Sequence, residues 1–170
     1  AAVSIIMYLQ FLCIGIYFGF SMGLSTPLGY AYGDRNFSVC RVLEKYAYRF
    51  FSIAPIILYG CTYLLAPIGV RFFASPGSTV FDMAVSGLRL YGLGFLFSGI
   101  NIFAAIRMMT YGKGYISGMI TFLRSFALLL LFLTILPRFL ELNGIWLAVP
   151  GAEILTLVVA LWTLRKKTVA

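Results

Sequence analysis

Two apolar runs near the end of the chain decide the fold: YISGMITFLRSFALLLLFLTIL at 115–136 and IWLAVPGAEILTLVVALWTL at 145–164. As α-helices rising ~1.5 Å per residue, both are long enough to cross a hydrocarbon core of ~30 Å. The segment between them, PRFLELNG at 137–144, is short. Because a short connection makes two helices antiparallel neighbours, we expect a helical hairpin here.

One charged residue interrupts each run, Arg124 in the first and Glu153 in the second. Counted from Leu140 in the turn, Arg124 lies 16 residues back and Glu153 lies 13 residues on, which corresponds to depths of ~24 Å and ~20 Å. Charges inside a membrane face the bundle interior and are paired or hydrated, so we expect these two to meet. The pair either senses substrate or a proton, or is a static link whose loss costs ~3–5 kcal/mol.

The composition is that of an integral membrane protein. The 170 residues are 62% hydrophobic and 11% charged, with a mean hydropathy of +0.99, whereas soluble domains carry roughly 25% charged residues. The chain has no histidine, which excludes imidazole catalysis and Ser-His-Asp triads within it. Its cysteines, Cys13, Cys40 and Cys61, lack C-x-x-C spacing and are expected to be packing residues. We expect no enzyme and no metal site.

The net charge of +8 does not indicate nucleic acid, because the basic residues stand at the ends of the apolar runs. The chain begins Ala1-Ala2-Val3, inside a hydrophobic segment, with no initiator methionine and no basic leader. We therefore expect it to be a piece of a longer protein.

Three more apolar segments precede the hairpin, at about 3–32, 46–70 and 80–110, which predicts an all-α polytopic bundle of five spanning helices. Pro27 is expected to kink or unwind the end of the first helix. A charged, amphipathic lead-in is expected before the second helix, and Ser78 or Thr79 can cap the third. The first helix also carries small residues that suit tight helix contact: Gly15, Gly19, Gly23 and Gly29.

The basic residues predict the orientation. If the chain crosses the membrane five times, nine basic residues fall at one membrane face: Arg35, Arg41, Lys45, Arg49, Arg107, Lys113, Arg165, Lys166 and Lys167. The other face receives Arg71, Arg89 and Arg138. By the positive-inside rule we expect a multi-pass protein of the cytoplasmic (inner) membrane with its C-terminus in the cytoplasm. Arg107 is expected to extend to the cytoplasmic interface.

Several other polar and aromatic residues allow two readings. Asn101, inside the third helix, is either a packing amide or a cavity ligand. Tyr30 and Tyr32 are either interfacial anchors or part of a pathway. Four aromatic residues of the first helix either line a cavity for planar cations through cation–π contacts or pack against lipid and neighbours: Tyr17, Phe18, Phe20 and Tyr30.

A series of motifs resembles the multidrug and toxic compound extrusion (MATE) transporters. GLSTPLGYAYG at 23–33 resembles the G…P…YNYG ending of that family's eighth helix. LRLYGLGF at 88–95, followed by GINIF at 99–103, is similar to the tenth. LRS at 123–125 and GIWLAVPGAEIL at 144–155 resemble the eleventh and twelfth, and the resemblance covers essentially the whole chain.

This resemblance implies that residues 1–170 are a partial C-terminal lobe, helices eight to twelve, of a transporter built from two lobes around a central cavity. It implies efflux of small cationic or amphipathic organic compounds, with the missing N-terminal lobe as partner and Na⁺ or H⁺ as coupling ion rather than a cofactor. Candidate residues of the substrate and cation pathway are Asn101, Arg124, Glu153, Tyr30, Tyr32 and Pro27.

The chain departs from the family pattern in three places. Ala31 stands where the family has Asn, and Pro27 stands one residue later than the family's proline. Some members have a carboxylate on the tenth helix, where this chain has Asn101, and an amide cannot carry a proton at neutral pH. The identity of the coupling ion therefore stays open. Two alternatives remain, a membrane-embedded binding subunit that docks on an energising complex and a lipid-linked sugar flippase of the same superfamily.

Overall fold

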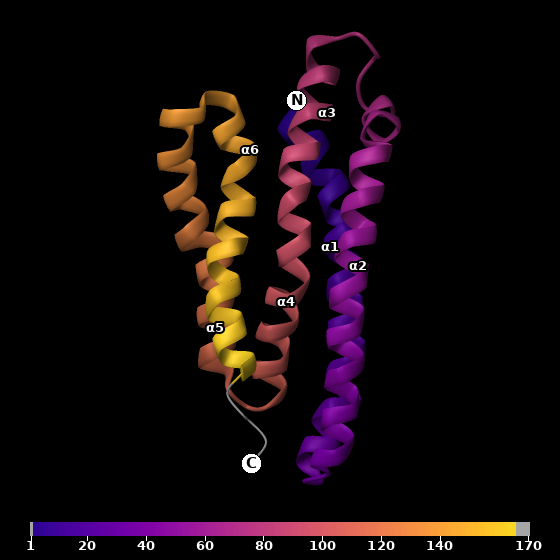
Figure 1. Cartoon of the computed structure of the whole chain (residues 1–170), viewed down its shortest axis with the longest axis vertical. Coiled ribbons are helices and arrows are strands. Elements are labelled where there is room, and N and C mark those ends of the chain that lie inside the picture. The colour runs from indigo at the N-terminus through magenta and orange to yellow at the C-terminus, as the bar shows by residue number, and fades with distance from the viewer. Residues whose placement is uncertain (1, 166–170) are drawn as a thin grey trace.

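The computed structural model describes residues 2–165, and every regular element in that range is a helix. In chain order these are α1 (Ala2–Gly33), α2 (Phe37–Arg71), α3 (Thr79–Tyr91), the 3₁₀ turn η1 (Gly92–Gly94), α4 (Phe95–Thr110), α5 (Gly114–Phe122), the π-helical turn η2 (Leu123–Ala127) and α6 (Leu128–Arg165). The long helices run side by side, with α3 and α4 between the α1–α2 pair and the α5–α6 pair (Figure 1).

The sequence predicts five spanning helices, but the described chain has four helical segments that are long and apolar enough to cross a membrane. These are Ala2–Gly33, Phe37–Arg71, Thr79–Thr110 and Gly114–Arg165. The count is lower because the last two predicted helices form one 52-residue segment. Helical geometry breaks within α6 at Glu141 (φ 49°, ψ −126°), and the chain folds back there, as Figure 1 shows. The predicted hairpin is thus present as two arms of one segment.

The close approach of the two arms explains Gly144, which lies just after this reversal. A Cβ atom on Gly144 would stand 2.5 Å from the carbonyl carbon and oxygen of Leu136. Any side chain at this position would therefore push the backbone of the second arm away from the backbone of the first arm at Leu136.

Helix boundaries differ from the predictions at two places. α2 begins at Phe37 rather than near Tyr46, because the Asn36 side chain caps it by accepting a hydrogen bond from the Val39 amide at 3.4 Å. α1 continues to Gly33 without unwinding at Pro27, so the expected unwinding is wrong.

The third predicted helix is capped by Ser78, whose hydroxyl accepts a hydrogen bond from the Phe81 amide at 3.2 Å. That rod is then interrupted by η1, between α3 and α4, where three residues of sequence Gly-Leu-Gly form a 3₁₀ turn. The sequence prediction of one helix over 80–110 missed this break.

The core is centred on α4. Tyr17 and Phe51 pack against it with Phe95 and Phe103, and a Cβ on Gly99 would lie 2.7 Å from the Phe51 ring. The glycine row of α1 behaves differently, because three of its four members have nothing within 4 Å: Gly15, Gly19 and Gly23. The predicted tight contact along this row is therefore wrong within the described chain.

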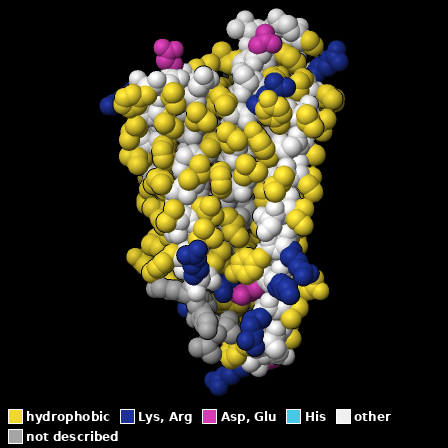
Figure 2. Space-filling model, viewed as in Figure 1, with side chains coloured by type: hydrophobic (Ala, Val, Ile, Leu, Met, Phe, Trp, Pro, Cys, Tyr) yellow, Lys and Arg dark blue, Asp and Glu magenta, His cyan; other side chains and the backbone are white. Residues whose placement is uncertain are grey.

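The charges gather at the two ends of the bundle. Dark blue side chains concentrate at the lower end in Figure 2, where α1, α4 and α6 end and α2 and α5 begin. The basic residues of these segments include Arg35, Arg41, Lys45, Arg49, Lys113 and Arg165. Lys166 and Lys167, which were counted with this face, lie outside the described residues.

Candidate functional site: a buried ion pair inside the bundle

Arg124 and Glu153 meet inside the bundle, as the sequence predicts. Arg124 Nη2 and Nε donate to the same carboxylate oxygen, Oε1 of Glu153, at 2.7 and 3.1 Å. The two side chains are 11% and 5% exposed, so the pair lies away from bulk solvent. A buried charge whose partner is removed is left uncompensated, so each residue depends on the other.

The backbone is irregular on the Arg124 side of the pair and closely packed on the Glu153 side. Arg124 belongs to η2, a π-helical turn, and such turns insert one residue into a helix and occur frequently at functional sites. Glu153 follows a close contact between α6 and η1, where a Cβ on Gly94 would lie 3.3 Å from the Val149 side chain. Gly94 therefore allows α6 to approach the α3–α4 rod one turn before Glu153.

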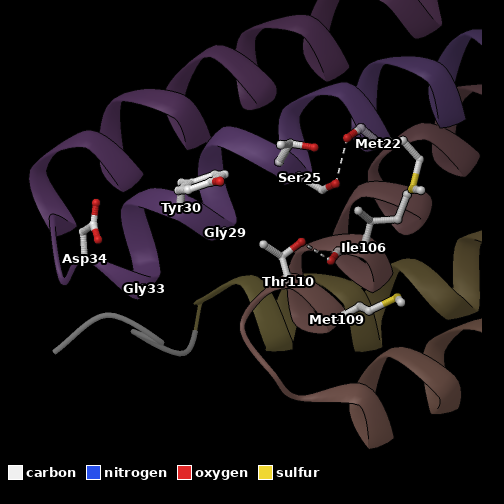
Figure 3. Close-up of a pocket in the computed structure, with 10 residues that line it drawn as sticks. Met22, Ser25, Gly29, Tyr30, Gly33, Asp34, Ile106, Met109 and Thr110 are labelled. Carbon is white, nitrogen blue, oxygen red and sulfur yellow. Dashed lines mark hydrogen bonds between the residues drawn. The ribbon is translucent and has the colours of Figure 1, made fainter.

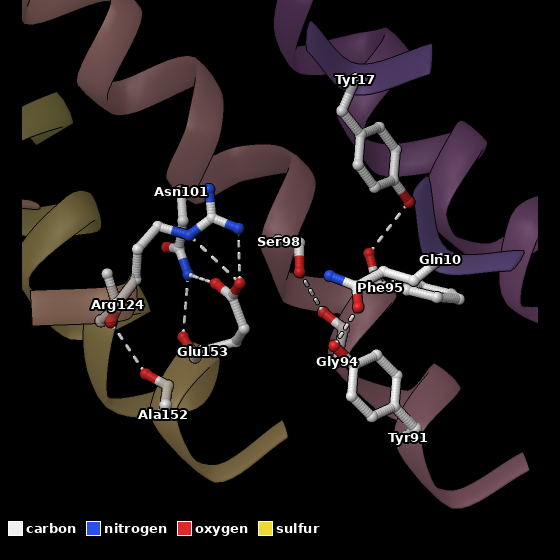
Figure 4. A network of polar contacts seen from close by, with 11 residues as sticks. Gln10, Tyr17, Tyr91, Gly94, Phe95, Ser98, Asn101, Arg124, Ala152 and Glu153 are labelled. Atoms are coloured by element: carbon white, nitrogen blue, oxygen red, sulfur yellow. Dashed lines mark hydrogen bonds and ion pairs between the residues drawn. The ribbon is translucent and has the colours of Figure 1, made fainter. Parts of the chain in front are cut away.

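Asn101 of α4 holds the other side of the carboxylate. Its Nδ2 donates to Glu153 Oε2 at 2.7 Å and to the Glu153 backbone carbonyl at 2.9 Å (Figure 4). The amide oxygen, Asn101 Oδ1, is buried and has no hydrogen-bond partner among the described residues. A buried acceptor left unpaired costs roughly 1–3 kcal/mol. Asn101 thus presents a free oxygen beside a carboxylate.

A hollow of about 180 Å³ adjoins the pair and is lined by Gln10, Tyr91, Arg124, Ser125, Leu129, Val149 and Glu153. The Tyr91 hydroxyl donates to the Gln10 side chain across it. Sequence reasoning missed Gln10, Tyr91 and Ser125. Gln10 carried a signal, because it is the one amide side chain in the apolar run of α1.

The chemistry available here is that of one carboxylate among neutral oxygens. Among residues 2–165, no group of three or more His, Cys, Asp and Glu side chains gathers to hold a metal ion. A proton or a monovalent cation would instead compete with the Arg124 guanidinium for Glu153. The nearby amide, phenol and hydroxyl groups are neutral hydrogen-bonding partners.

The remaining candidate residues lie elsewhere. Tyr30 is 76% exposed and lines an open groove of about 590 Å³ between α1 and α4, together with Asp34 and Met109 (Figure 3). Tyr32 packs against Tyr111, with ring centroids 4.5 Å apart. Pro27 is exposed on α1 and is not part of the lining of this groove.

The aromatic residues of α1 also separate into two groups. Tyr17 is buried and donates its hydroxyl to the Phe95 carbonyl at 2.9 Å, and Phe20 stacks on Phe50 with centroids 3.8 Å apart. Phe18 and Tyr30 are exposed. Of these four aromatic residues, Tyr17 is therefore a core residue and Phe20 packs against the core.

The comparisons with known proteins address the fold. The sequence matches no protein-family model and no curated protein. The structure matches a solved chain described as the inward-facing conformation of a multidrug resistance MATE family transporter of the MOP superfamily, with a TM-score of 0.79 and 19% sequence identity. The fold is that of part of a MATE transporter. The match covers 95% of this chain and 37% of the transporter chain, so the resemblance seen in the sequence is confirmed at the level of the fold.

A second buried charge pair lies near the lower end of this MATE-like bundle. The Arg107 side chain turns inward toward α2 instead of extending out of the bundle, and its place at the membrane interface stays a prediction. Arg107 is 3% exposed and forms an ion pair with Glu44 of α2. The Tyr111 hydroxyl donates to the same Glu44 oxygen, Oε1, at 2.6 Å. Burial, and then the hydrogen bond to Glu44, raises the pKa of the Tyr111 phenol, so this hydroxyl remains a donor at physiological pH.

Proposed function

We propose that this chain is a partial C-terminal lobe of a MATE-like, cation-coupled efflux antiporter and supplies one wall of its central cavity. The observation that carries the proposal is the structural match over 95% of the chain to a multidrug resistance transporter. Because the chain spans 37% of that transporter's length, the opposite wall is assigned to a second lobe outside this sequence.

In this proposal each arm of the hairpin formed by Gly114–Arg165 crosses the membrane, giving five crossings in all. The reversal at Glu141 supports this arrangement, since it returns the chain toward the end at which α5 begins. The basic residues at that end favour a cytoplasmic location for it by the positive-inside rule. Arg165, at the end of α6, would then lie on the cytoplasmic side.

Glu153 is the proposed coupling residue. With no ion bound, Arg124 neutralises the carboxylate from one side and Asn101 hydrogen-bonds it from the other. A proton on Glu153, or a sodium ion sharing it with Asn101 Oδ1, would weaken the hold on Arg124. The guanidinium would then turn into the adjoining hollow, which changes the contact between η2 and α6. An ion that binds the two arrangements with different affinity shifts the equilibrium between them.

The groove between α1 and α4 is the proposed part of the substrate path. Tyr30 offers an exposed ring for cation–π contact and Asp34 a carboxylate, while two methionines, Met22 and Met109, supply adaptable apolar surface. This lining suits small cationic or amphipathic organic molecules.

The test is transport by the complete protein in sealed proteoliposomes. Ethidium movement would be followed after imposing a sodium gradient or a pH gradient across the same vesicles. We expect ethidium export when one of these two gradients is imposed, and no export when neither gradient is present. Absence of ethidium movement under both gradients, with transfer of a lipid-linked sugar in the same vesicles, would favour the flippase alternative. Tight binding without movement would favour a binding subunit.

A further inference from the structure

The outer face of α2 carries a row of basic residues, Arg41, Lys45 and Arg49. They are spaced four residues apart, so successive members advance by about one helical turn and share one face. All three are exposed, and none forms an ion pair with another described residue. Glu44, on the same turns, faces inward to Arg107. The acidic residue is therefore used inside the bundle, while the basic residues remain free outside.

The position of this row relative to a bilayer follows from α2 itself. The 21 residues between Arg49 and Arg71 include no charged side chain, and as a helix they span ~32 Å, which matches a hydrocarbon core of ~30 Å. Arg49 then lies at the edge of the hydrocarbon. Lys45 lies ~6 Å further out, within a headgroup layer ~5–8 Å deep, and Arg41 lies ~12 Å out, in water.

A hollow of about 170 Å³ opens between the two basic residues that reach this layer, and it is lined by Val42, Lys45, Tyr46 and Arg49. Tyr46 is 58% exposed, and tyrosine is typical of the membrane interface. The hollow thus combines two unpaired cations with an apolar and an aromatic side chain. Dark blue side chains are visible over these first turns of α2 in Figure 2.

We propose that Lys45 and Arg49 bind the phosphate of an anionic phospholipid in the cytoplasmic leaflet. Arg49 can hold two phosphate oxygens through its planar guanidinium, and Lys45 contributes a compact charge. Tyr46, which lies at a depth between the two cations, contacts the glycerol, while Val42 closes the outer side of the hollow. A zwitterionic lipid would bring its own cation next to these two, so the site selects net negative charge. The site depends on the bilayer register of α2 and not on any transport activity.

The test measures lipid affinity of the complete, delipidated protein in detergent by titration with fluorescent phosphatidylglycerol, with phosphatidylcholine as the neutral reference. The variant is Lys45→Gln/Arg49→Gln. The matched control is Arg71→Gln/Arg138→Gln, which removes two exposed charges from the opposite end. At about fivefold per basic residue, we expect affinity for phosphatidylglycerol to fall roughly 20- to 30-fold in the variant and to be unchanged in the control.

Three results would overturn the proposal. The affinity for phosphatidylglycerol could be unchanged in Lys45→Gln/Arg49→Gln, or it could fall equally in the control. The variant could also lose affinity for phosphatidylcholine and for phosphatidylglycerol by the same factor. Displacement by inorganic phosphate at the concentrations that lipid requires would identify a free-anion site and would also overturn it. The melting temperature without lipid should be the same in both variants, because all four side chains are exposed, so misfolding cannot imitate the expected result.

Discussion

Residues 2–165 of the bundle hold two buried arginine–carboxylate pairs, and their surroundings differ. Glu44 and Arg107 lie near the lower end, where the Tyr111 hydroxyl completes a compact cluster that joins α2, α4 and the following turn. Glu153 and Arg124 lie in the interior, between a π-helical turn and α6. Beside this second pair are an amide oxygen without a partner and a hollow lined by polar groups.

This difference separates a structural link from a candidate switch. In the lower cluster, both the ion pair and the phenol converge on one oxygen of Glu44, and removing any member loosens the contact between helices. In the interior cluster, Arg124 has an adjoining hollow to move into and Asn101 has a free acceptor. We therefore expect substitutions in the lower cluster to change stability alone, and those in the interior cluster to change the response to ions as well.

The largest effect is expected from Arg124→Ala in the complete protein. It leaves Glu153 buried and unpaired, at a cost of ~3–5 kcal/mol, and it should abolish gradient-driven efflux. The double variant Arg124→Leu/Glu153→Leu separates the causes, because replacing both partners of a buried pair by apolar residues is often neutral for stability. It should recover the melting temperature in detergent and stay inactive. Efflux by the double variant would identify a static pair.

Arg107→Ala is expected to cost less, about 1–3 kcal/mol, because Glu44 is 12% exposed and water can partly replace the lost partner. Its efflux should keep the ion dependence of the unaltered protein, measured at a temperature where both are folded. A change of coupling ion or a loss of coupling would mean that the lower cluster also takes part in ion exchange.

Gly99→Val tests the packing that carries both clusters, since α4 contributes Asn101 and Arg107. The Phe51 ring leaves no room for a Cβ at this position, so overpacking should destabilise by ~1–3 kcal/mol. Gly19→Val is the control, because a Cβ there meets nothing within 4 Å. Thermal unfolding in detergent should separate the two, and equal melting temperatures would contradict the observed packing of α4.

The smallest effect is expected from Tyr111→Phe, which removes one hydrogen bond to a charged group at a cost of ~1.5 kcal/mol. The folded-state pKa of Tyr111 is raised above its ordinary value. Its contribution is therefore complete below that ordinary value and is lost only as the pH rises through the folded-state pKa. The loss of stability should thus be the same at mildly acidic and mildly alkaline pH. A loss that varies within this range would contradict a protonated phenol.

The sequence predicts most of the fold because apolar length is a strong signal in a membrane protein. The pairing of Arg124 with Glu153 was also predictable, since their distances from one turn are similar. Three features left too weak a signal: the early start of α2, the 3₁₀ turn η1, and the burial of Arg107. The start of α2 depends on a local cap by Asn36, and η1 lies against α6 at Val149. The burial of Arg107 depends on a tertiary contact with the carboxylate of Glu44, which lies 63 residues before it in the chain.

The candidate site was only partly predictable for the same reason. Asn101 was recognised as an interior polar residue, but its hydrogen bonds to Glu153 depend on how α4 and α6 pack. Gln10 and Tyr91 join the site from α1 and the end of α3, and no local pattern relates positions so far apart. Tyr30, Tyr32 and Pro27 were grouped with the site by resemblance, and the structure places them away from it.

The central claim is that Glu153, and not Glu44, couples ion binding to transport. The most direct measurement compares Glu153→Gln with Glu44→Gln in the complete protein, by ethidium export from proteoliposomes under imposed sodium and pH gradients. The account predicts that Glu153→Gln no longer responds to either gradient, while Glu44→Gln keeps the response of the unaltered protein. Retention of the gradient response by Glu153→Gln would contradict it.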